Sequence, residues 1–148
     1  NIERLHKLLA EQIMAGLCFA DNEDGTREKA EERKRTSDEL SIQLISRLPK
    51  IRAMLATDVL AAYNGDPAAE NVGEIISCYP VIKALTNYRI AHELVALDVP
   101  LIPRIMTEMA HSETGIPAII CSASSLWSLS MFTPIWYFIV LVLTVDFP

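Results

Sequence analysis

The chain has 148 residues, of which 13 are Lys or Arg and 19 are Asp or Glu, so its formal net charge is -6. This length is enough for one domain that buries its own core without disulfides or metals. The negative charge argues against a nucleic-acid partner, which is held mainly through basic contacts to phosphate. Cys18, Cys78 and Cys121 are odd in number and far apart, which predicts no metal site and no disulfide framework and favours a cytoplasmic location.

The first part of the chain has the apolar spacing of helices. Apolar residues recur every three or four positions from residue 2 to residue 17, which predicts a helix with one apolar stripe. A mixed-charge run at 27–35 is interpreted as a solvated loop or helix face. Thr36 and Glu39 fit a capping box, so a second helix is predicted from about Ser37. Pro49 lacks an amide hydrogen and predicts a kink or a break in that helix.

Glycine and proline residues divide the second part of the chain. Gly65 is a candidate helix stop that can adopt positive φ, and Asp66 followed by Pro67 predicts an N-cap and a first helical position. Pro80 opens the next strong helix, and a last amphipathic segment ends at Gly115. No strand-like alternation precedes Gly115, so the predicted fold class is all-α.

Several single residues have simple structural interpretations. Arg89 lies four residues before Glu93, which predicts an ion pair on one helix face. His92 is interpreted as structural, because no serine or cysteine nucleophile is placed near it. Cys78 has apolar neighbours and is predicted to be a buried, inert thiol. None of these residues by itself indicates a reaction.

Three blocks of sequence carry a more specific signal in combination. They are Asp-Val-Leu-Ala-Ala-Tyr-Asn-Gly-Asp-Pro-Ala-Ala at 58–69, Cys-Tyr-Pro at 78–80 with Asn-Tyr-Arg-Ile-Ala-His at 87–92, and Pro-Arg-Ile-Met-Thr-Glu-Met-Ala-His-Ser-Glu-Thr-Gly-Ile at 103–116. Together they resemble the amino-terminal helical domain of serine O-acetyltransferases. The resemblance covers about residues 1–116 and is densest from Asp58 onward, so residues 1–115 are expected to form this helical domain.

The resemblance implies a reaction and a site. The reaction is acetyl transfer from acetyl-CoA to the hydroxyl of L-serine, which gives O-acetylserine for cysteine biosynthesis. In the family an aspartate in an Asp-Pro-Ala context lies at the serine pocket, which makes Asp66 and Pro67 the expected serine-binding residues here. A carboxylate suits this task, because its hydrogen bond to an ammonium group is charge-assisted. Without the resemblance, Asp66 would be interpreted as an N-cap alone.

The resemblance ends after Ile116. In the family this point leads to Asp-Ile-His-Pro and to hexapeptide repeats, which form a left-handed parallel β-helix. That β-helix carries the catalytic histidine, its aspartate and the acetyl-CoA groove, so no catalytic, acetyl-CoA-binding or metal-binding residue is predicted in this chain. We expect the chain as given not to acetylate serine, and its status as an enzyme stays open. The family's carboxy-terminal tail, which docks into O-acetylserine sulfhydrylase, also has no counterpart here.

Residues 116–148 form a separate apolar segment, with no charged side chain between Glu113 and Asp146. Its length permits a membrane span at 130–145, but the serines, Pro134 and the absence of flanking Lys or Arg disfavour one. We expect a frameshift, a mis-spliced end or a truncated gene model first, a membrane anchor second and a packed β-rich extension third. Two alternative functions follow: a non-catalytic module that forms homo-oligomers through the helical domain, and a small membrane-tethered helical protein.

Overall fold

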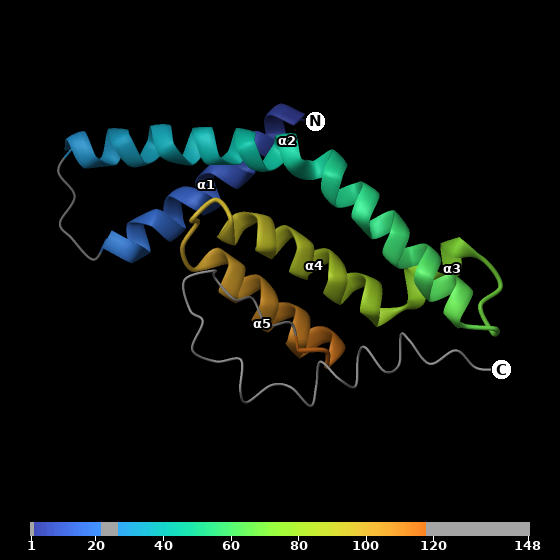
Figure 1. The fold of residues 1–148 in the computed structure, drawn as a ribbon. Coiled ribbons are helices and arrows are strands. Elements are labelled where there is room, and N and C mark those ends of the chain that lie inside the picture. Colours follow the sequence, from blue (N-terminus) through green and yellow to red (C-terminus); the bar gives the residue numbers. More distant parts are fainter. Residues whose placement is uncertain (1, 22–26, 118–148) are drawn as a thin grey trace.

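One long helix organises the protein, and the other helices pack against it or against each other. The computed structural model describes residues 2–21 and 27–117, in which the helices are α1 (Ile2–Asp21), α2 (Arg27–Gly65), α3 (Val72–Cys78), α4 (Pro80–Val95) and α5 (Ile102–Thr114). Helix α2 contacts α1, α3 and α4, and α5 lies along α4 (Figure 1). No strand is formed in these two ranges, so the predicted all-α class is confirmed.

Helix α2 begins earlier than the sequence predicted. It is continuous over 39 residues from Arg27, so Thr36 and Glu39 lie inside it and the predicted capping box is wrong. The mixed-charge run is the exposed beginning of this helix rather than a loop. Ser37 and Ser41 are buried, and each hydroxyl donates to the backbone carbonyl three residues earlier, at 2.8 Å and 2.9 Å. These bonds satisfy two hydroxyl groups that would otherwise be costly to bury.

Pro49 produces a bend in α2 and does not end the helix. The residue lies inside the helical span, and the axis of α2 changes direction along its middle part (Figure 1). A proline removes one backbone hydrogen bond and clashes with the preceding turn, which accounts for a kink. The kink separates two parts of α2 that belong to different clusters of buried side chains.

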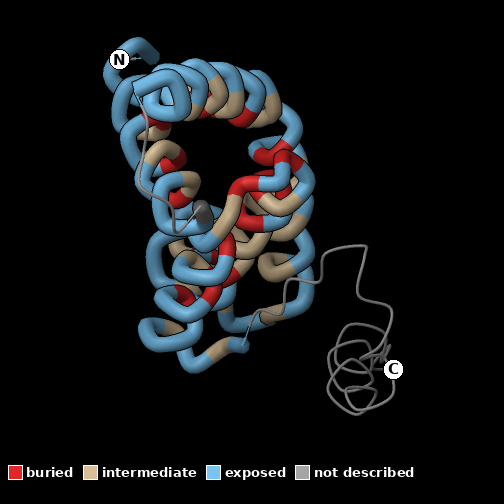
Figure 2. Tube along the Cα trace, turned by 90° about the vertical axis from the view of Figure 1, so that its left-hand side faces the viewer, coloured by how far each residue is buried: buried red, intermediate tan, exposed pale blue. Residues whose placement is uncertain are grey.

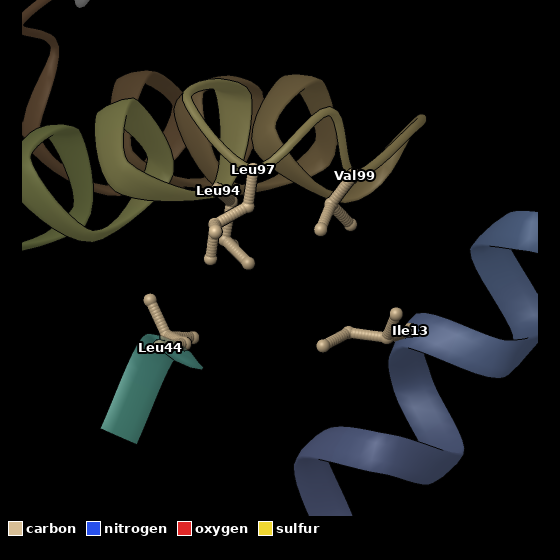
Figure 3. Close-up of a cluster of buried hydrophobic side chains, with 5 residues drawn as sticks. All are labelled: Ile13, Leu44, Leu94, Leu97 and Val99. Carbon is tan, nitrogen blue, oxygen red and sulfur yellow. The ribbon is translucent and has the colours of Figure 1, made fainter. Parts of the chain in front are cut away.

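The first part of α2 belongs to a cluster of buried side chains from widely separated segments. We call it the Ile13 cluster, and its members are Ile13, Leu44, Leu94, Leu97 and Val99. Figure 3 shows the three residues from the end of α4 and the following loop pointing toward Leu44 of α2 and Ile13 of α1. Beside this cluster, α1 comes close to the loop between α4 and α5: a Cβ added to Gly16 would lie 2.9 Å from the carbonyl oxygen of Pro100.

The second part of α2 belongs to a smaller cluster. We call it the Ile75 cluster, and its buried members are Val59 of α2, Ile75 of α3 and Ile82 of α4. Tyr63 and Tyr79 pack against it and are half-buried. Figure 2 shows the buried positions on the sides of the helices that face one another.

Local signals at the helix ends were largely correct. Helix α2 ends at Gly65 as predicted, although this glycine does not adopt positive φ. Helix α4 begins at Pro80. Gly115 follows α5 with a φ of 69°, and its amide donates to the carbonyl of His111 at 2.8 Å. This left-handed cap is the conformation that favours glycine.

Candidate functional site

Asp66 lies immediately after α2, at the start of the loop that leads to α3. Its carboxylate Oδ1 accepts a hydrogen bond from the amide of Ala68 at 2.9 Å, and its backbone carbonyl accepts one from the amide of Ala69 at 3.1 Å. The loop therefore folds back on Asp66 as a tight turn. Asp66 is half-buried, whereas Pro67 and Ala68 are exposed, so the turn is open to solvent on one side.

The predicted capping role of Asp66 is wrong. No helix begins at Pro67, and α3 begins at Val72 instead. Its N-cap is Asn71, whose side-chain oxygen accepts from the amide of Glu74 at 3.0 Å. Because another residue caps α3, the carboxylate of Asp66 is available for a different role.

Tyr79 holds the second carboxylate oxygen of Asp66. It lies between α3 and α4, and its phenolic hydroxyl donates to Oδ2 of Asp66. This hydrogen bond, followed by the one from Ala68, lowers the pKa of Asp66 below its ordinary value of 3.8. The same bond, with burial and the nearby negative charge, raises the pKa of Tyr79 to about 12. At neutral pH the site therefore contains an ionised carboxylate and a protonated phenol.

The structure brings Tyr79 to Asp66 by pairing α2 with α4. Arg89 of α4 donates from Nε and Nη2 to the two carboxylate oxygens of Asp58 on α2, each at 2.6 Å. Such a bidentate pair fixes both distance and orientation. Asp58 lies on α2 a short way before Asp66, which follows the end of that helix, and Arg89 lies on α4 a short way after Tyr79, which precedes that helix. The clamp therefore sets how the end of α2 faces the beginning of α4.

The predicted ion pair between Arg89 and Glu93 is wrong. Glu93 is 6% exposed and accepts from Arg47 at 2.8 Å and from Lys50 at 3.3 Å, both on α2. Arg47 lowers the pKa of Glu93 below its ordinary value of 4.5 against the opposing effect of burial, and Lys50 adds to this lowering. Arg89 and Glu93 thus both connect α4 to α2.

Two other sequence interpretations can be compared with the structure. His92 is exposed, and its ring centroid lies 6.1 Å from that of Tyr88. Cys78 is exposed at the end of α3, so the predicted burial of its thiol is wrong. Within residues 2–21 and 27–117, no group of three or more His, Cys, Asp and Glu side chains is arranged to hold a metal ion.

An open pocket of about 500 Å³ lies next to Tyr79. It is bounded by the end of α3, the first turns of α4 and the end of α5, and its lining includes Cys78, Tyr79, Thr86 and Asn87. Lys83 and Glu113 also line it and form an ion pair at 2.5 Å between α4 and α5. Tyr79 therefore lines the pocket and also donates its hydroxyl to Asp66.

The expectations for the apolar segment fall mostly outside the described residues. The predicted span at 130–145 lies outside the described residues, and so does all of the 116–148 segment, with its three possible origins, beyond residue 117. Among the helices of the described part, none has both the length and the apolar character needed to cross a membrane.

Comparison with known proteins shows which proteins the chain is similar to. No family model matches it. Over 117 residues of its N-terminal part it is 42% identical to "Serine acetyltransferase, plasmid" of Synechococcus elongatus, a match that covers 78% of this chain and 37% of that protein. It is 40% identical over 62 residues to a serine acetyltransferase of Synechocystis, covering 42% of this chain and 25% of the relative. It is 37% identical over 59 residues to the serine acetyltransferase of Mycobacterium tuberculosis, a match that covers 40% of this chain and 26% of that protein.

The helical part of the chain is therefore related to serine acetyltransferases, and the resemblance predicted from the three sequence blocks is confirmed. The chain spans less than half the length of each of these curated relatives. Sequence reasoning had missed the contact of Tyr79 with Asp66. The two residues are 13 positions apart, and no periodic signal joins them because α3 lies between.

Proposed function

We propose that this chain supplies the serine-binding helical part of a serine O-acetyltransferase, with Asp66 as the contact for the substrate's ammonium group and Pro67 shaping the turn beside it. The observation that supports the proposal is the state of the Asp66 carboxylate. It is held by hydrogen bonds on both oxygens, its pKa is lowered, and it lies on a turn that solvent reaches. A fixed, ionised carboxylate is suited to binding a primary ammonium group.

In the proposed reaction, the hydroxyl oxygen of L-serine attacks the thioester carbonyl of acetyl-CoA. The new ester bond forms O-acetylserine, the thioester bond breaks, and the coenzyme leaves as a thiol whose sulfur takes up the proton that the serine hydroxyl loses. The role of this chain's residues is to bind and orient: Asp66 fixes the ammonium end of serine. Holding one end of a reactant in a defined position reduces the entropy that must be lost in the reacting complex.

The proposal can be tested by completing the chain with a relative's remaining part. Residues 1–116 would be fused to the C-terminal region of the 42% identical Synechococcus protein, and thiol release from acetyl-CoA would be followed. We expect serine-dependent turnover from the fusion, little from the C-terminal region alone, and none with glycerate, which lacks the ammonium group. A fusion that folds and binds acetyl-CoA but shows no serine-dependent turnover would contradict the proposal.

A second candidate function, an assembly module for homo-oligomers, is favoured by one surface of α5. Ile105 and Met109 of α5 lie four residues apart and are 45% and 54% exposed, and Leu101, the residue just before α5, is 37% exposed. Residues at this spacing share one side of a helix, and large exposed apolar side chains on one side commonly mark an interaction surface. A second copy of the chain could cover this stripe.

Sedimentation of the full chain would test the assembly proposal. We expect an oligomer for the wild type and a shift toward monomer for Ile105→Glu, because a charge on the stripe must be desolvated on association. Gln12→Glu introduces the same charge at an exposed position of α1 and serves as the matched control. A wild-type monomer at all concentrations would overturn the proposal.

A further inference from the structure

The hydrogen bond between Tyr79 and Asp66 determines which further hydrogen bonds the two side chains can make. The phenolic proton is donated to Oδ2 of Asp66, so the Tyr79 oxygen retains only its lone pairs for a further partner. Each oxygen of a carboxylate can accept more than one hydrogen bond. Oδ1 of Asp66 accepts from Ala68 and Oδ2 accepts from Tyr79, and each can accept again.

Both side chains can therefore accept further hydrogen bonds from a ligand, but neither has a proton left to donate. An ammonium group is the matching ligand chemistry, because it has three N–H donors and no acceptor. The hydroxyl of a tyrosine can usually serve as donor or acceptor, but here Asp66 fixes it as an acceptor for an incoming ligand. The raised pKa of Tyr79, about 12, means that the hydroxyl keeps its proton and does not act as a base near neutral pH.

Access to the pair also fits a small ligand. Asp66 and Tyr79 are half-buried, and the exposed Pro67 and Ala68 leave one side of the turn open. Tyr79 packs against the Ile75 cluster and is also one of the residues that line the open pocket between α3, α4 and α5. Its hydroxyl is thus positioned by packing as well as by Asp66.

We propose that Tyr79 is a second, specificity-determining contact for the substrate's ammonium group, with its phenolic oxygen accepting one N–H while Asp66 accepts another. This inference rests on the proposed serine-binding role of Asp66. It predicts that the site binds a ligand with a primary ammonium group more tightly than a ligand that has a hydroxyl and a carboxylate but no ammonium group.

The test uses the full chain labelled with carbon-13 and follows two signals by NMR, the Cγ of Asp66 and the Cζ of Tyr79. L-serine is titrated against the wild type, against Tyr79→Phe and against Tyr63→Phe. Tyr63 is the matched control, because it packs against the same cluster and takes no part in the hydrogen bonds of Asp66. D-glycerate is the control ligand without an ammonium group.

We expect L-serine to shift both carbons along one saturation curve and glycerate to shift neither. Tyr79→Phe should weaken serine binding about tenfold, the effect of losing one hydrogen bond to a charged group. It should also raise the pKa of Asp66, whereas Tyr63→Phe should change neither quantity.

Three results would overturn the inference. If serine shifts Asp66 but not Tyr79 in the wild type, or if Tyr79→Phe binds serine as tightly as the wild type, Tyr79 makes no contact and the role of Asp66 stands. If serine produces no saturable shift at Asp66 in the wild type, the proposed function of Asp66 fails and the role of Tyr79 fails with it. The wild-type spectra alone show whether serine shifts Asp66 without shifting Tyr79, so that result needs no variant.

Discussion

The Ile13 cluster and the Ile75 cluster lie on the two sides of the Pro49 kink and are built from very different lengths of chain. The first joins α1, α2, the end of α4 and the loop after it, so its members span residues 13–99. The second joins the end of α2, α3 and the start of α4 within residues 59–82. The first fixes the global arrangement of the helices, whereas the second holds a local turn of chain that carries Asp66. Proteins commonly open locally in regions with few buried contacts, so the candidate site lies in the part of the molecule expected to open more readily.

The largest expected effect is the loss of stability when a buried residue of either cluster is truncated. Leu44 is 1% exposed and Ile75 is 0% exposed, so replacing either with Ala should cost about 2 to 5 kcal/mol. By hydrogen exchange, Leu44→Ala should lower protection in α1 and α4 and leave the amides of α3 unchanged. Ile75→Ala should lower protection in α3. Equal loss of protection in α3 for both variants would show that the clusters form one cooperative unit.

The next effect concerns the clamp that holds α4 against the second part of α2. The Asp58 and Arg89 side chains are 17% and 23% exposed, and Arg89→Ala leaves Asp58 without its bidentate partner. We expect a loss of about 2 kcal/mol in the free energy of unfolding, less than for a fully buried pair because both groups retain some solvent. Urea unfolding measures it. Arg104→Ala removes an arginine from an exposed pair and should change stability by less than about 0.5 kcal/mol.

A pH-dependent effect is expected at Glu93, near the Ile13 cluster. Its folded-state pKa is lowered below 4.5 by Arg47 and Lys50, so its ionised form stabilises the fold. Glu93→Gln should cost about 1.5 kcal/mol above pH 4.5. The difference between wild type and variant should shrink as the pH falls through the folded-state pKa of Glu93. A difference that stays constant from pH 7 to pH 3 would contradict this assignment.

The smallest expected changes in stability are those of replacing either of two helical glycines with Ala. A Cβ on Gly16 would lie 2.9 Å from the backbone oxygen of Pro100, so Gly16→Ala should destabilise the Ile13 cluster by about 1 kcal/mol after the gain in helix propensity. A Cβ on Gly65 meets nothing within 4 Å, and Gly65 does not need positive φ. Gly65→Ala should therefore be neutral or stabilise by about 0.5 kcal/mol. Thermal unfolding of both variants would check the sign of each change.

The features that sequence predicted correctly are those with local causes. Pro80 and Gly115 mark helix ends because proline and glycine restrict or free their own backbone. The capping box at Thr36 was misread, because the preceding run of Glu, Lys, Arg and Ala has high helix propensity and continues the helix through it. The sequence marked Asp66 through the family resemblance but could not indicate its environment.

The contacts that sequence could not predict join residues on different helices. Arg89 pairs with Asp58 across 31 positions, although Glu93 was available one turn away on the same helix. The choice depends on how α4 packs against α2, and spacing along one helix does not contain that information. The same holds for Tyr79 and Asp66, which meet because α3 reverses the chain between them.

The role of Asp66 in serine binding is tested most directly by Asp66→Asn in the fusion with the relative's C-terminal region. Asn has nearly the same shape but no charge, so the turn should survive while the charged hydrogen bond to the ammonium group is lost. We predict that the KM for serine rises about ten- to hundredfold and the KM for acetyl-CoA stays the same. An unchanged KM for serine in a folded variant would contradict the account and leave Asp66 with a purely structural role.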